Sequence, residues 1–136
     1  MKRRSFTLVE IMIIVAIIAL LSAMAIPNLL KARLQTNESA AQATLKTIAK
    51  EEATYRSANP TYATLMQLGA PGTKNGYNFA VGVGTQHFVA TAVPAAANVS
   101  GGRSFCITED GIVRRDAAIV AGTDHDTCQG YSVASP

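Results

Sequence analysis

The longest uncharged stretch of the chain lies near its start. Between Glu10 and Lys31 there are twenty residues without a charge, IMIIVAIIALLSAMAIPNLL. A helix of that length covers about 30 Å, which is the thickness of the hydrocarbon core of a bilayer. The segment from Met1 to Arg4 carries three basic residues, Lys2, Arg3 and Arg4, which places the N-terminus in the cytoplasm by the positive-inside rule. The pattern therefore predicts a membrane-spanning helix over residues 6–30.

After this stretch the pattern becomes that of a helix with one apolar face, over residues 31–57. The apolar positions recur at helical spacing, with Glu52 interrupting them, and they are Ala41, Leu45, Ile48 and Tyr55. Asn59-Pro60 ends the pattern, because the residue before a proline is pushed out of the α region. We expect a continuous helix from Phe6 to about Ser57.

Residues 58–136 read as a β-rich head. Four runs fit strands, and they are Tyr77–Val83, His87–Val93, Ser104–Thr108 and Ile112–Arg114. Asp110-Gly111, between the last two, is a strong hairpin signal. An antiparallel sheet of three or four strands needs a cover, and the apolar face of the helix supplies one. The predicted fold is α+β: a long N-terminal α-helix, membrane-spanning in its first half, packed against a small antiparallel sheet.

Charge and composition narrow the function. The chain has 136 residues, with twelve Lys and Arg against nine Asp and Glu, and three of these bases lie in the first four positions. The remainder is neutral, so direct nucleic-acid binding is not expected, because it requires a clustered surplus of bases. No set of residues in the sequence has the pattern of a catalytic centre, so we expect neither an enzyme nor a cofactor.

Two general interpretations of the N-terminus remain open on these grounds. One is a simple signal anchor. The other is a cleaved secretory signal, in which Ala23-Met24-Ala25 has the small-x-small form of a peptidase site and a soluble binding protein would begin at Ile26. Glu10 at the edge of the apolar region and Pro27 just behind the cut argue against cleavage there.

A more specific interpretation comes from the string Phe6-Thr7-Leu8-Val9-Glu10. With its short basic leader and the aliphatic run behind it, this string resembles the N-terminus of type IV pilins and type II secretion pseudopilins. The resemblance implies that prepilin peptidase removes residues 1–5 by cutting between Ser5 and Phe6, and that the new amine is methylated. Ser5 stands where the family almost always has glycine.

The resemblance also implies an assembly role for Phe6, Glu10 and Pro27. In such a filament the carboxylate of Glu10 would pair with the amine of Phe6 in a neighbouring subunit and set the axial register. The plainer interpretation is a carboxylate that reaches the headgroups from the edge of the span. Pro27 removes one helical N–H, so we expect the helix to bend or open there. That weak turn would let the helix extend or curve as subunits pack.

The remaining chemistry lies in the head. Cys106 and Cys128 are the only cysteines, and an even count in an oxidising compartment suggests one disulfide, which would hold a loose C-terminal segment over residues 117–136. Two free thiols are the alternative. The acidic and imidazole residues that could form a calcium site, but fit a solvated loop better, are Glu109, Asp110, Asp116, Asp124, His125 and Asp126.

These expectations describe a homo-oligomeric helical filament whose subunit waits in the inner membrane for prepilin peptidase and an assembly machinery. The mature product would be an extracellular pilus or a periplasmic pseudopilus. A C-terminal region closed by a disulfide, without a recognisable calcium loop, favours the pilus subunit over the secretion pseudopilin.

Overall fold

The computed structural model describes residues 6–117 and 119–134, so the leader residues 1–5, including Ser5, lie outside it. Helix α1 runs over Leu8–Ala58, close to the predicted limits, and it continues through Pro27. The chain forms two compact units, residues 1–33 and 34–136. The first contains the start of α1, and the second contains the rest of α1 together with the sheet.

The second unit holds an antiparallel sheet whose six strands follow one another in chain order. The strands are β1 (Thr73–Lys74), β2 (Tyr77–Val83), β3 (Phe88–Pro94), β4 (Ser104–Thr108), β5 (Val113–Asp116) and β6 (Ser132–Val133). The four predicted strands are present, with β3 and β5 shifted by one or two residues. The expected total of three or four strands was too low, because two-residue edge strands extend the sheet on both sides.

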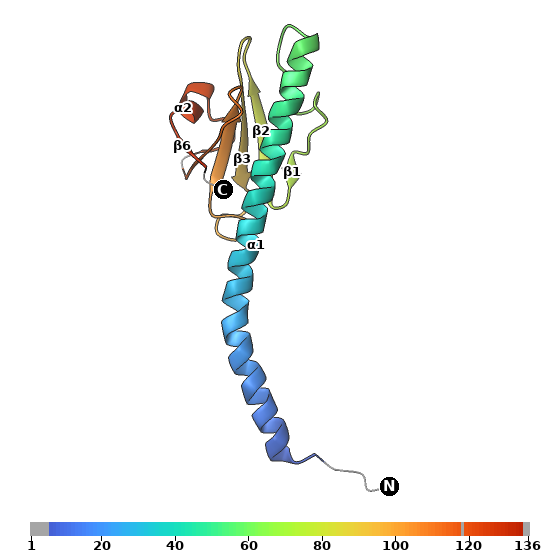
Figure 1. Cartoon of the computed structure of the whole chain (residues 1–136), viewed down its shortest axis with the longest axis vertical. Helices are drawn as coiled ribbons and strands as arrows, with labels where there is room; N and C mark the ends of the chain where they lie inside the picture. The colour runs from blue at the N-terminus through green and yellow to red at the C-terminus, as the bar shows by residue number, and fades with distance from the viewer. Residues whose placement is uncertain (1–5, 118, 135–136) are drawn as a thin grey trace. The chain divides into compact units, whose positions relative to one another are not determined.

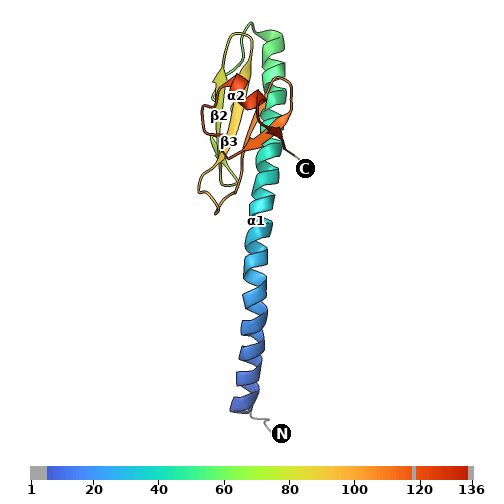
Figure 2. The ribbon, with the colours of Figure 1, turned by 90° about the vertical axis from the view of Figure 1, so that its left-hand side faces the viewer.

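One face of this sheet carries the main core. Side chains alternate between the faces of a strand, so Phe88, Ala90 and Ala92 of β3 point the same way. They pack with the predicted helix positions Ala41, Leu45 and Ile48, which are at most 1% exposed. Figures 1 and 2 show residues 34–58 of α1 lying along the sheet. The prediction that this stripe covers the sheet is confirmed for these three positions, whereas Tyr55, the last position of the predicted stripe, is half-buried and lies outside this core.

The opposite face carries a smaller core that the prediction missed. Val89 and Cys106 point there and pack with Ile119 and Cys128. The C-terminal segment was expected to be loose, but it forms α2 (His125–Gln129) and strand β6. The predicted disulfide is present: Cys106 and Cys128 are joined, with their Cα atoms 6.1 Å apart. The bridge joins α2 to β4, and β6 pairs with β5.

The loop between β3 and β4 is fastened to α1. The Asn37 side chain donates a hydrogen bond to the Ser100 carbonyl at 2.8 Å, and the Glu38 carboxylate accepts one from the Gly102 N–H at 3.1 Å. Arg103 lies 3.5 Å from the same carboxylate. Three links, from Ser100, Gly102 and Arg103, therefore hold this loop to the helix.

We predict that Gly101→Ala destabilises the protein by about 1–3 kcal/mol, the usual cost of overpacking a filled site. A Cβ at Gly101 would overlap the Tyr77 hydroxyl, which donates a hydrogen bond to the Arg103 carbonyl at 2.8 Å. The measurement is urea unfolding of the full chain in detergent, followed by near-UV circular dichroism.

The neighbouring glycine provides the matched control for this change. A Cβ at Gly102 would come no closer than 3.6 Å to Glu38 Oε1, which is ordinary contact. Gly102→Ala should therefore leave the free energy of unfolding within about 0.5 kcal/mol of the wild-type value. Equal effects at the two positions would show that the Tyr77 contact does not limit the packing here.

Candidate assembly site in the N-terminal helix

The first half of α1 is apolar on every side. Its large side chains between Phe6 and Leu30 are all at least 46% exposed, and nothing in the described part of the chain covers them. They are Phe6, Leu8, Val9, Ile11, Met12, Ile13, Ile14, Val15, Ile17, Ile18, Leu20, Leu21, Met24, Ile26, Leu29 and Leu30. The helix is long and apolar enough to cross a membrane. A helix without a polar face requires lipid or other helices around it.

The first turn of α1 is closed by a reciprocal pair of hydrogen bonds between Thr7 and Glu10. The Thr7 hydroxyl accepts the Glu10 N–H at 3.2 Å. The Glu10 carboxylate oxygen Oε2 accepts both the Thr7 N–H, at 3.0 Å, and the Thr7 hydroxyl, at 2.9 Å. This arrangement is a capping box, which satisfies donors that a helix start otherwise leaves unpaired.

The capping box adds a role for Glu10 that the sequence analysis did not assign. The signal for it is in the sequence, because a threonine three positions before a glutamate at the start of an apolar run is the capping-box pattern. Glu10 is therefore held at the helix start by its own chain. The structure brings Thr7 and Glu10 together, and Phe6 immediately precedes Thr7 in the chain.

Pro27 lies in the middle of the apolar half of α1. Its ring cannot supply the N–H that the Ala23 carbonyl would accept in an unbroken helix. In the next turn position, the Asn28 side chain donates a hydrogen bond to the Met24 carbonyl at 3.2 Å. A side-chain donor thus supports the backbone beside the proline, and the predicted bend or opening at Pro27 stays a prediction.

The second half of α1 contains a buried carboxylate whose partner the sequence analysis missed. Glu52 is fully buried, and its Oε2 accepts the Ala63 N–H at 2.9 Å. Its Oε1 has no hydrogen-bond partner among the described residues. Burial raises the pKa of this carboxyl, and the Ala63 hydrogen bond partly offsets that. The residue that interrupts the apolar stripe therefore ties the loop after α1 to the helix.

The acidic and imidazole residues of the head separate into two groups. The Asp110 carboxylate accepts hydrogen bonds from the Thr108 hydroxyl and the Ile112 N–H, both at 2.9 Å, and lies 2.6 Å from Arg114. His125 instead bonds Glu109 and Asp126. No group of three or more His, Cys, Asp and Glu side chains suited to a metal ion occurs within residues 6–117 and 119–134.

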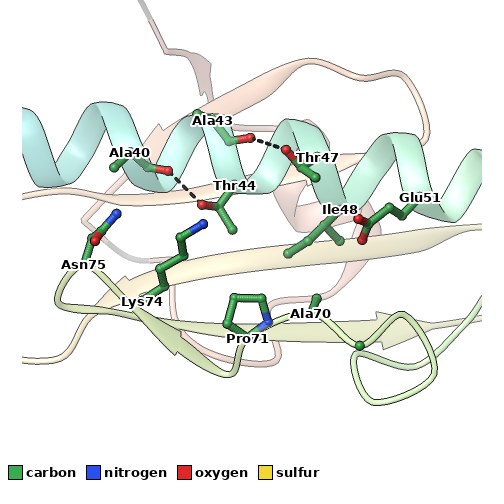
Figure 3. A pocket seen from close by; sticks show the side chains of 11 residues that line it. Ala40, Ala43, Thr44, Thr47, Ile48, Glu51, Ala70, Pro71, Lys74 and Asn75 are labelled. Atoms are coloured by element: carbon green, nitrogen blue, oxygen red, sulfur yellow. Dashed lines mark hydrogen bonds between the residues drawn. The ribbon is translucent and has the colours of Figure 1, made fainter.

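A hollow of about 410 Å³ lies between α1 and the loop that leads into β1. Figure 3 shows Thr44 and Thr47 on its helix side, with their hydroxyls donating to the Ala40 and Ala43 carbonyls at 2.9 and 3.0 Å. These hydroxyl hydrogens are already used within the helix. Glu51, Lys74 and Asn75 also line the hollow. The apolar start of α1, which nothing in the described part of the chain covers, is the better candidate site.

Comparison with known proteins bears on that site. Residues 1–26 match the family described as the prokaryotic N-terminal methylation motif. The type IV wide pilus major component PilA4 of Thermus thermophilus is 38% identical over 82 residues, covering 57% of this chain and 63% of the relative. The type IV major pilin protein PilA of Myxococcus xanthus is 37% identical over 82 residues, covering 59% and 37%.

The chain thus spans less than two thirds of the length of these relatives. The methylation motif covers the leader, the capping box and most of the uncharged stretch, up to residue 26. The fold adds a helix whose second half packs on an antiparallel sheet, and a disulfide that joins this sheet to α2. Motif, fold and relatives agree that this chain is similar to type IV pilins.

Proposed function

We propose that this chain is a structural subunit of a type IV pilus-like filament. Before assembly, residues 6–30 span the inner membrane, with the leader in the cytoplasm and the head outside. Prepilin peptidase removes residues 1–5, and the assembly machinery then stacks the subunits through α1. The proposed role is mechanical, and it requires neither a catalytic residue nor a cofactor.

The observation that carries this proposal is the apolar surface around the first half of α1. All its large side chains are exposed, from Phe6 to Leu30, and two kinds of surroundings can cover them: lipid chains or helices of other copies. Moving from lipid into a bundle of helices gains close van der Waals contact rather than hydrophobic burial. One surface thus serves both storage and assembly.

Glu10 supplies the specificity in this proposal. Both hydrogen bonds that its carboxylate accepts from Thr7 end on Oε2, which leaves Oε1 for a donor from another chain. After the leader is removed, the amine of Phe6 in a neighbouring copy is such a donor. A half-made charge pair in an apolar core is costly, so copies that dock out of register are rejected.

Pro27 contributes to assembly in the same proposal. The turn that lacks its N–H is the weakest point of the apolar half, so it can open or curve while the rest of α1 keeps its hydrogen bonds. Curvature there would adjust each helix to its neighbours as copies leave the membrane.

Two other functions compete with the pilus subunit. A secretion pseudopilin would use the same helix, but both relatives described above are named as pilus pilins, which favours the pilus. A secreted binding protein cleaved after Ala25 would discard most of the apolar helix. In that case the methylation motif over residues 1–26 would have no use in the mature protein.

We predict that the mature protein begins at Phe6 with an N-methylated amine, because the motif places the cut after Ser5. Intact-mass and N-terminal peptide analysis of the protein isolated from cells tests this. Ser5→Gly is the matched variant, and it should be processed at least as completely as the wild type, since glycine is the usual residue of the family there. A mature N-terminus at Ile26 would overturn the filament proposal in favour of the secreted protein.

We predict that Glu10→Gln inserts in the membrane but lowers filament yield about tenfold or more. Glutamine can still accept the Thr7 hydrogen bonds of the capping box, so the helix start stays formed while the charge is lost. The neighbour's amine would then enter the core unpaired, at a cost of several kcal/mol, where about 1.4 kcal/mol is a factor of ten. The measurement compares sheared filaments with membrane-bound subunit.

Thr7→Val is the control that separates the cap from the charge. Valine removes the hydroxyl of the capping box but keeps the Glu10 carboxylate, at a cost of about 1 kcal/mol to the helix start. We expect this variant to assemble better than Glu10→Gln. If Glu10→Gln gave normal filaments while Thr7→Val did not, the Glu10 side chain would act only in the capping box of the helix. The proposed charge pair between subunits would then be wrong.

A further inference from the structure

The imidazole of His125 connects α2 to the turn between β4 and β5. Its Nε2 lies 2.7 Å from Glu109 Oε1, and its Nδ1 lies 2.9 Å from Asp126 Oδ1. Gln129, one turn further along α2, lies 3.2 Å from the same Nε2. The side chain of His125 is only 14% exposed. The link to Glu109 spans 16 residues of sequence, so it joins two separate elements.

The same short helix carries one half of the disulfide. Cys128 lies three residues after His125, and both Cys106 and Cys128 are fully buried. A reagent can reach this bridge only if α2 moves away from β4. Two connections oppose that movement near the bridge: the packing of the small second core and the contact between His125 and Glu109.

We propose that His125 and Glu109 form a pH-sensitive latch that keeps α2 closed over the Cys106–Cys128 disulfide. With a charged imidazole, the latch is an ion pair between α2 and the turn after β4. When the imidazole loses its proton, the ion pair is lost. Only one ring nitrogen then carries a hydrogen, so at most one of the two carboxylate contacts persists, as an ordinary hydrogen bond. The inference concerns only the head, so it does not depend on the proposed assembly function.

The direction of the pH effect follows from the groups around the imidazole. The hydrogen bond to Asp126 raises the pKa of His125 above its ordinary value, and the hydrogen bond and charge of Glu109 act in the same direction. A raised folded-state pKa contributes stability that is complete below about pH 6.5, the ordinary imidazole value, and is lost as pH rises through the raised value. The latch therefore opens on the alkaline side.

His87, in the turn between β2 and β3, is the other imidazole that faces the latch. Its ring centroid lies 4.5 Å from that of His125, with the planes inclined by 34°. Among the described residues, the other charged groups that act on His125 are Asp124 and Asp126, both from the α2 side. The ion pair of His125 is with Glu109 and does not include His87. The loss of that ion pair at alkaline pH therefore does not require His87. It serves as the matched control.

The test measures how fast a water-soluble phosphine reduces the disulfide in the full wild-type chain in detergent, at pH 6 and at pH 9. The phosphine takes oxygen from water to become its oxide, and the cystine becomes two thiols. Rates are divided by those of a small-molecule disulfide at each pH, which removes the pH dependence of the reagent. We expect the normalised rate to be about two- to fivefold higher at pH 9, the range for a partly exposed ion pair.

Three variants decide the outcome. His125→Gln and Glu109→Gln should both be reduced at pH 6 as fast as the wild type at pH 9, with the pH dependence abolished. His87→Gln should keep the dependence of the wild type. A wild-type reduction rate that is equal at the two pH values would overturn the latch. So would a Glu109→Gln variant that keeps the pH dependence of the wild type. Because Glu109 is exposed, misfolding would not explain that second result. Filament yield does not enter this measurement.

Discussion

The structure depends on one constraint: the first half of α1 has no polar side and no cover within the described chain. Every large side chain from Phe6 to Leu30 is exposed. In water such a helix would expose a continuous apolar surface far larger than soluble monomers tolerate. The chain can therefore be stable only where lipid or other helices replace water around this surface. The membrane before assembly and the filament after assembly, as proposed, both supply such surroundings.

The same helix solves a different problem in its second half. There the apolar positions narrow to a stripe, and Ala41, Leu45 and Ile48 become fully covered by the sheet. Links outside the stripe then fix the head to the helix, with Glu38 holding the loop before β4 and Glu52 holding the loop after α1. The change from an all-round apolar surface to a single stripe divides one continuous helix into two functional parts.

Much of this could be predicted from sequence because it rests on periodic patterns. The helix limits, β2 and β4 follow from spacing and turn residues, which act locally. Strands β1 and β6 were missed because two residues carry no period, and they exist only through pairing with β2 and β5. Likewise α2 depends on the disulfide at Cys128, a constraint from a distant strand.

The candidate site shows the same division between local and distant information. The Thr7–Glu10 capping box was readable from its spacing, whereas the partner of Glu52 was not. Ala63 lies eleven residues away across a turn, and nothing in the local pattern points to its N–H. In the sequence, Glu52 therefore only interrupts the apolar stripe. The fold shows that its carboxylate accepts the buried Ala63 N–H.

The capping box also limits what the Glu10 charge pair can contribute to assembly. In an isolated subunit the carboxylate is not bare, because Thr7 already gives it two hydrogen bonds. The free energy gained when a neighbour's amine arrives is therefore smaller than for an unsatisfied carboxylate in lipid. A misplaced subunit, by contrast, still leaves an amine buried without a partner, and that cost is undiminished. Affinity between copies must then come from the apolar surface, while the charge pair selects the register.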